Sequence, residues 1–180
     1  MKAMVITKIV HKLEDREGSV LMESIIGISL VMIGIMGIIT LLVRSSNLYN
    51  SAANNLKATY LAAEGIEVVK NVIDTSYVSN GNVWNPPSSG WYYPDYLTTV
   101  GSFSTVHNPP GPRAAQFVKL DNESGYNLSV GTDTIFRRIV NIQNNGSYLK
   151  VLSYVSWVEG GDQKQILLED HFYDWRPKNR

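Results

Sequence analysis

Hydrophobic residues follow three different patterns along this chain, and each pattern predicts a different kind of element. The first is a run from Ser24 to Val43, 20 residues without a charge and made mostly of Ile, Leu, Val, Met and Gly. A helix of that length rises about 30 Å, which matches the hydrocarbon core of a bilayer. The run therefore predicts a membrane-spanning helix.

The second pattern, over residues 45–74, is helical but one-sided. No proline interrupts it, and its apolar or small residues recur in steps of three and four, which is typical of an amphipathic helix that buries one stripe. We expect one continuous helix from about Val20 to Asp74, with its second half packed on a globular head. The predicted stripe consists of Leu48, Ala52, Leu56, Thr59, Ala63, Ile66, Val69 and Ile73.

The third pattern begins at Ala115, where apolar and polar residues alternate with a period of two. Such alternation predicts strands of a sheet with one solvated face, as where Arg137 and Arg138 lie beside Phe136 and Ile139. The predicted fold class is α+β, with the long N-terminal helix packed on an antiparallel meander of about four strands. Five segments carry the pattern, at 115–121, 124–130, 134–143, 147–159 and 163–175.

Residues 75–114 show none of these patterns. They hold all but one of the seven prolines together with many glycines and serines, which predicts a long surface loop. Its aromatic side chains are expected to pack the loop onto the head, and a sugar-binding platform is the alternative interpretation. They are Trp84, Trp91, Tyr92, Tyr93 and Tyr96.

Composition narrows the function classes. The 16 basic and 16 acidic side chains give a net charge of zero, so no nucleic-acid partner is predicted from charge. Cysteine is absent, which excludes disulfides, thiolate metal sites and cysteine nucleophiles. The three histidines, His11, His107 and His171, lack the spacing of zinc ligands.

Candidate chemistry is sparse, and we predict neither an enzyme nor a bound cofactor or metal. No nucleophile–base signature, phosphate loop or H-E-x-x-H motif is present. The oxygen-rich stretch 121–125 could ligate calcium, but a hairpin turn explains it more simply. Glu169, Asp170 and Asp174 could be proposed as acid/base groups, but a solvated strand explains them better.

The flanks of the apolar run carry most of the functional information. Four cations precede the run and two follow it, which predicts a cytoplasmic N-terminus and an exported C-terminal part; they are Lys2, Lys8, Lys12 and Arg16, then Arg44 and Lys57. The only charged residue between Gly18 and Arg44 is Glu23. A carboxylate in hydrocarbon costs at least about 2.5 kcal/mol, so Glu23 either reaches the membrane interface or pairs with a charge on a neighbouring helix.

A charged leader ending in Gly18, then "SVLME" with Glu23 in fifth place, then a long apolar helix resembles the class III signal of type IV prepilins. Pseudopilins of type II secretion share this signal. The resemblance implies that prepilin peptidase cleaves after Gly18, that Ser19 becomes the mature and often methylated N-terminus, and that Glu23 is the signature glutamate. It also implies a pilin-like fold, and Tyr60 to Asp74 looks like a stretch recurrent in pilin-like proteins.

Two positions depart from the family pattern. Serine replaces the usual first phenylalanine at Ser19, which leaves methylation open, and no proline occurs before Pro86. Three glycines inside the run could serve either bending or close helix packing. They are Gly27, Gly34 and Gly37.

The resulting organisation is a leader (1–18), a transmembrane or filament-core helix (19–44), an amphipathic helix (45–74), a loop (75–114) and a sheet (115–180). The expected function is a minor pilin-like structural subunit of a type IV pilus-type filament. The chain would cross the inner membrane once with its N-terminus inside, and later form an extracellular or periplasmic filament. Implied partners are prepilin peptidase, other pilin subunits in a homo- or hetero-filament, the inner-membrane assembly platform, and membrane lipid before assembly.

Two alternatives remain open. A pseudopilin of a type II secretion or DNA-uptake system would carry the same signal. A membrane-tethered extracellular binding module with an uncleaved signal anchor would not depend on Gly18.

Overall fold

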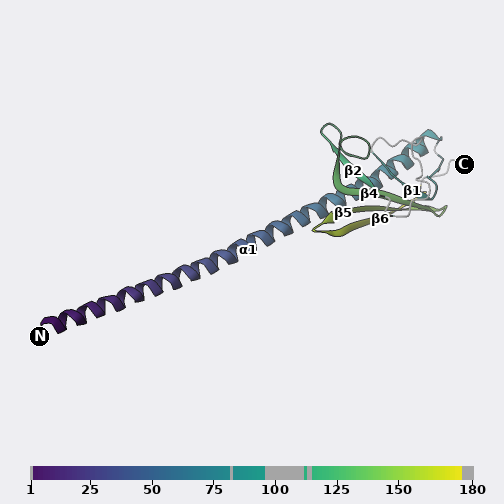
Figure 1. The fold of residues 1–180 in the computed structure, drawn as a ribbon. Helices are drawn as coiled ribbons and strands as arrows, with labels where there is room; N and C mark the ends of the chain where they lie inside the picture. The colour runs from purple at the N-terminus through teal and green to yellow at the C-terminus, as the bar shows by residue number, and fades with distance from the viewer. Residues whose placement is uncertain (1, 82, 96–111, 113–114, 176–180) are drawn as a thin grey trace. The chain divides into compact units, whose positions relative to one another are not determined.

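A computed structural model describes the backbone of residues 2–81, 83–95, 112 and 115–175, and within these ranges the side chains from residue 18 onward. The chain forms two compact units, Met1–Asn50 and Ser51–Arg180. The first consists of the N-terminal part of helix α1, and the second contains the rest of α1 and an antiparallel sheet (Figure 1). The predicted α+β class, a long N-terminal helix with an antiparallel sheet, is confirmed.

Helix α1 runs from Lys2 to Ser79 and ends beyond the predicted boundary at Asp74. The backbone N–H of Asn80 donates to the carbonyl of Ser76 at 3.0 Å. Gly81 then takes a left-handed conformation with φ 67°, the usual way for a glycine to end a helix. This glycine, rather than the first proline, stops the helix.

The sheet has six strands where the sequence predicted about four, in the order β3-β2-β4-β5-β6, with β1 also paired to β4. Each of the five predicted segments overlaps one of β2 to β6. Strands β4, β5 and β6 form the expected meander, whereas β3 lies on the far side of β2. The bounds are β1 (Gly90–Tyr92), β2 (Gln116–Asp121), β3 (Gly125–Asn127), β4 (Thr132–Asn144), β5 (Tyr148–Glu159) and β6 (Asp162–Tyr173).

Strand β1 lies in the segment predicted to be a loop. It pairs with Val140–Ile142 of β4, on the same edge that β2 joins at Thr132–Arg138. Three residues between prolines carry too little alternation to be recognised as a strand. Much of the predicted loop, with Tyr96, lies outside the described residues.

Two apolar clusters join α1 to the sheet within the second unit. Both form because α1 presents small or branched side chains to the face of the sheet that covers it. The first contains Ala58, Leu61, Ala62, Val118, Leu128, Phe136, Val155 and Trp157, and the second Val69, Ile73, Tyr92, Val140, Ile142, Leu149 and Val151.

The predicted buried stripe of α1 is only partly right. Val69 and Ile73 are buried and Ile66 is half-buried, but the stripe positions nearer the N-terminus are exposed. The sheet is contacted instead by a neighbouring stripe of smaller residues. The exposed positions are Leu48, Ala52, Leu56, Thr59 and Ala63, and the buried ones are Ala58, Leu61, Ala62 and Gly65.

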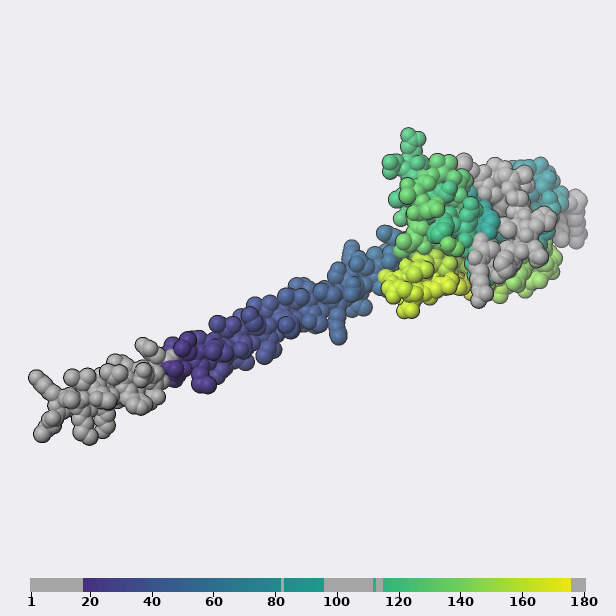
Figure 2. Space-filling view, in the orientation of Figure 1, coloured from purple at the N-terminus to yellow at the C-terminus, as the bar shows by residue number. Residues whose placement is uncertain are grey.

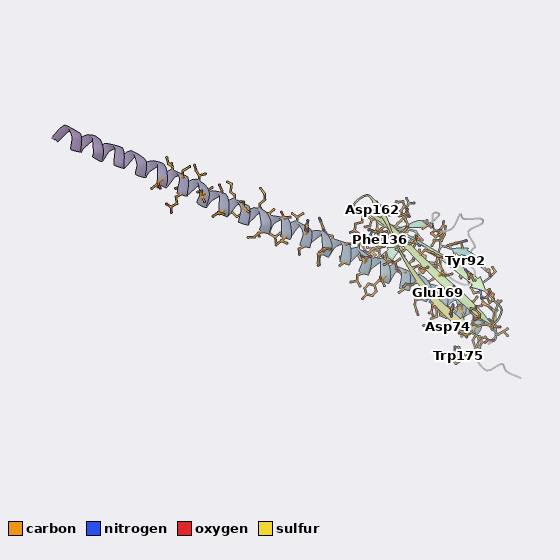
Figure 3. All side chains as sticks on the ribbon, turned by 90° about the horizontal axis from the view of Figure 1, so that it is seen from below. Asp74, Tyr92, Phe136, Asp162, Glu169 and Trp175 are labelled. Atoms are coloured by element: carbon orange, nitrogen blue, oxygen red, sulfur yellow. The ribbon has the colours of Figure 1, made fainter. Side chains whose placement is uncertain are left out.

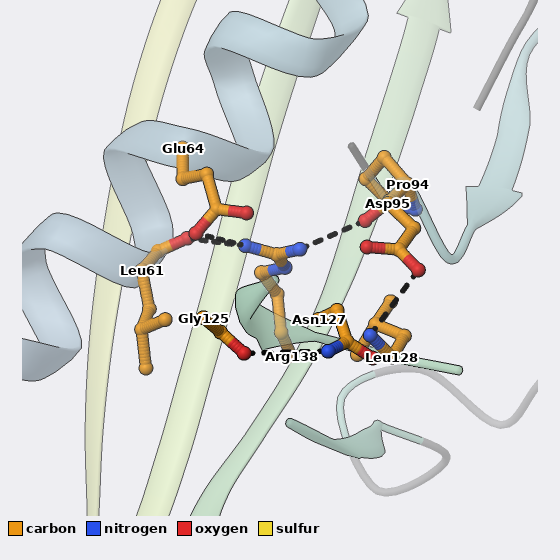
Figure 4. Close-up of polar contacts among 8 residues, drawn as sticks. All are labelled: Leu61, Glu64, Pro94, Asp95, Gly125, Asn127, Leu128 and Arg138. Atoms are coloured by element: carbon orange, nitrogen blue, oxygen red, sulfur yellow. Dashed lines mark hydrogen bonds and ion pairs between the residues drawn. The ribbon is translucent and has the colours of Figure 1, made fainter. Parts of the chain in front are cut away.

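The expectation of one solvated sheet face does not hold at the centre of the sheet. Arg138 is completely buried between the sheet and α1, while Ile139 and Leu152, on the opposite face, are 0% and 6% exposed. Arg138 donates to the carbonyls of Leu61 (3.0 Å) and Pro94 (2.9 Å) (Figure 4). Both faces of the central strands are therefore covered.

The segment around β1 packs onto the head as predicted. Tyr92 is buried against the second cluster, Trp84 packs beside it and Tyr93 packs against the first cluster. Trp91 lies 5.5 Å from Tyr154, centroid to centroid. Buried Asp95 accepts hydrogen bonds from the backbone of Leu128 and the hydroxyl of Ser129, which ties the segment to the β3–β4 connection.

Candidate functional site

The apolar part of α1 is exposed on all sides. From residue 20 to 43 its large hydrophobic side chains are 51% to 71% exposed, and Figure 2 shows these side chains along the purple helix. Soluble chains rarely expose so large an apolar surface unless a membrane or another protein covers it. By length and composition this helix could cross a membrane.

The hydroxyl groups of the apolar run are satisfied by carbonyls of their own helix. The hydroxyls of Ser24, Ser29 and Thr40 donate to the carbonyls four residues earlier at 2.7–2.8 Å, so they need no partner in an apolar medium. Glu23 lies directly before the run, and its carboxylate cannot be satisfied by helix carbonyls because an ionised carboxylate only accepts hydrogen bonds. No hydrogen bond or ion pair of Glu23 is found among the side chains described from residue 18 onward.

The three residues singled out by the sequence lie close together on α1. Gly18, Ser19 and Glu23 are exposed and helical. Ser19 and Glu23 are four residues apart, so they share one face of the helix one turn apart. A charge created at Ser19 would therefore lie on the same face as the carboxylate of Glu23.

The glycines of the run leave open surface on the helix. A Cβ atom built at Gly27, Gly34 or Gly37 would meet nothing within 4 Å. No contact within the described chain therefore requires glycine there, and both earlier interpretations, bending and close packing by another helix, remain.

A second exposed apolar surface lies on the part of α1 that belongs to the second unit. Leu56 and Tyr60 are 56% and 68% exposed, and exposed Ala52 and Ala63 extend this stripe in both directions. Tyr60 was absent from the predicted stripe, although its spacing of four from Leu56 could have indicated it. We call Ala52, Leu56, Tyr60 and Ala63 the exposed stripe.

The acidic turn at Asp121 is accounted for by hydrogen bonds within the turn. One carboxylate oxygen accepts from the hydroxyl of Ser124 (2.8 Å) and from the N–H groups of Ser124 (3.0 Å) and Glu123 (3.2 Å). These bonds lower the pKa of Asp121, and the hydrogen bond from the Ser124 hydroxyl is the largest cause. Among the described side chains no group of three His, Cys, Asp or Glu could hold a metal ion.

Of the three carboxylates near the C-terminus, Glu169 is engaged by cations on the sheet surface. Glu169 contacts Lys150 at 2.9 Å and His171 at 3.2 Å, and the hydrogen bond from Lys150 is the main cause that lowers the pKa of Glu169. Asp170, the next residue of β6, points to the other face of the sheet. Glu169 is thus part of a surface ion cluster.

No protein-family model, curated protein or solved structure matches the chain. The residues of the chain itself therefore carry the functional inference.

Proposed function

We propose that this chain is a minor pilin-like structural subunit of a type IV pilus-type filament. The observation that carries the proposal is an apolar helix that is exposed on all sides, 51% to 71% at its large hydrophobic residues from 20 to 43, with the exposed carboxylate of Glu23 near its start. Glu23 also stands fifth after Gly18, as in the prepilin signal that the sequence resembles. In a simple membrane anchor the same carboxylate would reach the membrane interface instead.

In the proposed pathway, prepilin peptidase cleaves after Gly18 and frees the α-amine of Ser19. The amine brings a positive charge to the start of the apolar helix. Unpaired, either charge would be unfavourable in hydrocarbon, whereas a pair between neighbouring helices is tolerated and fixes their register. Glu23 of one subunit then pairs with the Ser19 amine of the next.

During assembly, neighbouring subunits replace lipid as the surroundings of the apolar helix. In the inner membrane the lipid tails are as apolar as the helix, so packing and the charge pair, rather than the hydrophobic effect, select neighbours. Once the assembly platform extracts the subunit, water would face the same side chains, and each buried Leu, Ile, Val or Met is worth about 1.5–3 kcal/mol. Other pilin subunits, identical or different, then replace the lipid.

The first test is the N-terminus of the protein in its native membrane. We expect intact mass and N-terminal sequencing to give a chain that starts at Ser19, and expect Gly18→Ala to abolish or strongly reduce that species. Gly27→Ala is the matched control, because it changes a glycine of the same helix with no neighbour within 4 Å. A chain starting at Met1 would contradict the proposal and favour a tethered binding module with an uncleaved anchor.

A second test separates processing from assembly. Glu23→Gln keeps the size and removes the charge, so we expect normal cleavage but filaments that lack the variant. Incorporation equal to the wild type, measured by immunoblot of sheared filaments, would contradict the pairing of Glu23 with Ser19.

A further inference from the structure

Strand β6 forms one edge of the sheet. Among the described residues it pairs only with β5, along all of its 12 residues and without a bulge. Proteins usually protect an edge strand by keeping it short or by adding a proline or a bulge, because its unpaired backbone groups can bind another strand. β6 is long and contains no proline, and Leu167 at its centre is 46% exposed. Its free edge is therefore suited to pair with a further strand.

The odd-numbered residues of β6 direct their backbone N–H and C=O groups to this free edge. The N–H of Asn145 donates to the carbonyl of Tyr148 at 3.1 Å, so the even-numbered residues of β5 direct theirs toward β4. Lys150 of β5 is paired with His171 of β6, and the N–H of His171 is therefore directed away from β5. In agreement, this N–H donates to the side chain of Asp170 at 2.8 Å.

We propose that the free edge of β6 pairs with β6 of a second copy, antiparallel and centred on Leu167. The contact is isologous, because each copy contributes the same strand to it. In this register Lys164 of each copy lies opposite Asp170 of the other. Ile166 lies opposite Leu168, and the backbone of Leu167 bonds to that of Leu167 in the second copy. Within β6 no two like charges are directly opposed.

The charge pattern of β6 identifies a second copy as the partner. Lys164 and Asp170 lie three residues on either side of Leu167. Both are exposed, and both lie on the same face of the sheet. Opposite charges in directly opposed cross-strand positions are stabilising, and like charges there are destabilising. A register centred one residue earlier, on Ile166, would instead place Asp162 opposite Asp170.

The pairing joins heads that run in opposite directions. Ile166 packs against the first apolar cluster and Phe172 against the second, so β6 meets the two clusters in the same order as α1. Figure 3 shows Asp162 and Trp175 toward the two ends of this strand. Antiparallel pairing of β6 therefore reverses the α1 segments of the two heads. Neighbours in one filament share a direction, so the pair links two filaments that run oppositely, a step that rests on the filament function proposed above.

Cysteine variants of the full-length chain test the register, because the chain has no cysteine of its own. Lys164→Cys and Asp170→Cys are purified separately from native membranes with different tags, then mixed in detergent under oxidising conditions. We expect a mixed disulfide, because the Cα atoms of this pair would lie about 4.5 Å apart, which a disulfide can span. Neither variant alone should form it, because identical positions would lie about 20 Å apart.

His171→Cys is the matched control for Asp170→Cys. It is the next residue of β6 and is also exposed, but its side chain lies on the other face of the sheet. Its mixture with Lys164→Cys should give at least about tenfold less mixed disulfide, because the two Cβ atoms point apart. Equal yields from the two mixtures, or no mixed disulfide with Asp170→Cys, would overturn the pairing.

Charge reversal tests the contact with a reporter that keeps the charged residues. Ile166→Cys mixed with Leu168→Cys reports the same register. Lys164→Asp or Asp170→Lys, introduced into both chains, opposes like charges twice and should lower the disulfide yield at least about fivefold. Both reversals together in each chain restore opposite charges and should restore the yield. A yield that does not respond to these reversals would overturn the proposed register.

The N-terminus of the same samples separates this pairing from the filament function. A mixed disulfide between chains that start at Met1 would support the pairing of heads and contradict the filament. No mixed disulfide between chains that start at Ser19 would overturn the pairing and leave the filament function standing.

Discussion

Position 138 carries a charge where the alternation of the sequence gave no reason to expect burial. The guanidinium of Arg138 donates to carbonyls of α1 and of the segment after β1, and it lies 3.2 Å from the carboxylate of Glu64. One planar side chain therefore joins three parts of the second unit. Its Nε has no partner within the described contacts, so the site depends on the two terminal nitrogens.

Replacement of Arg138 by lysine should be damaging although the charge is kept. One ammonium group cannot reach both carbonyls and Glu64 in the geometry of the guanidinium fork, and a buried charge that loses partners is strongly destabilising. We expect Arg138→Lys to lower the free energy of unfolding by about 2 kcal/mol or more, measured by urea unfolding in detergent. Exposed Arg137→Lys is the control, expected within about 0.5 kcal/mol of wild type; equal stabilities of the two variants would contradict the role of Arg138.

The turn at Asp121 should respond to acid. Its pKa is lowered in the folded chain, chiefly by the Ser124 hydroxyl, so the ionised form is favoured by folding. Its contribution is complete above the ordinary carboxyl pKa of about 3.9 and is lost as the pH falls through the lowered folded value. We expect the Ser124 amide proton to titrate in NMR spectra with a midpoint below that ordinary value.

Asp121→Asn removes the titrating group and keeps its shape. The Ser124 titration should then disappear. A midpoint at or above the ordinary carboxyl value in the wild type would show that the turn does not hold the ionised form.

At the scale of elements, periodicity predicted that a helix and strands form, but not which of their surfaces pack together. The helix and the five strand segments followed from spacings of 3.6 and 2 along the chain. Leu56 and Leu61 both belong to stripes with helical spacing, yet only Leu61 is buried, at 3% exposure. The small residues beside Leu61 allow the helix to approach the sheet closely. Which helix residues are buried depends on strands more than 70 residues away in sequence, because Arg138 of β4 donates a hydrogen bond to the carbonyl of Leu61.

Gly65 lies where the helix approaches the sheet closely, and it should resist substitution. A Cβ at this position would lie 2.8 Å from the Ser153 hydroxyl and 3.2 Å from a Val140 methyl. Overpacking typically costs 1–3 kcal/mol, and the better helix propensity of alanine returns about 1 kcal/mol. We expect Gly65→Ala to destabilise the head by about 1 kcal/mol, followed by the fluorescence of buried Trp157.

Gly34→Ala is the matched control for Gly65→Ala. It gains the same helix propensity with nothing within 4 Å of the new atom, and it lies in the first unit. The unfolding of the head should not change. A Gly65→Ala protein as stable as this control would mean that Ser153 and Val140 move aside freely.

At the scale of the whole molecule, the two units depend on the environment in different ways. The head has its own buried clusters, whereas the side chains of residues 18–50 are all exposed. Gly18, Ser19 and Glu23 could be singled out from the sequence because the proposed processing signal is a local motif. A groove lined by residues of β2, β4, β5 and β6 could not, because strand pairing brings together residues that share no spacing.

The exposed stripe provides a way to separate folding of the head from assembly. Leu56→Lys places a charge on a surface that water already reaches, so the free energy of unfolding should stay within about 0.5 kcal/mol of wild type. Leu61→Lys would bury an unpaired charge in the first cluster and should prevent the head from folding.

If the stripe packs against neighbouring subunits, Leu56→Lys should be cleaved and folded normally but absent from sheared filaments, because the lysine would lose its hydration there. Unfolding curves measure whether the Leu56→Lys variant folds, and immunoblots of sheared filaments measure whether it is incorporated. Full incorporation of a folded Leu56→Lys protein would show that the stripe faces solvent in the filament, and would restrict the assembly surface to the apolar run and to contacts of the head.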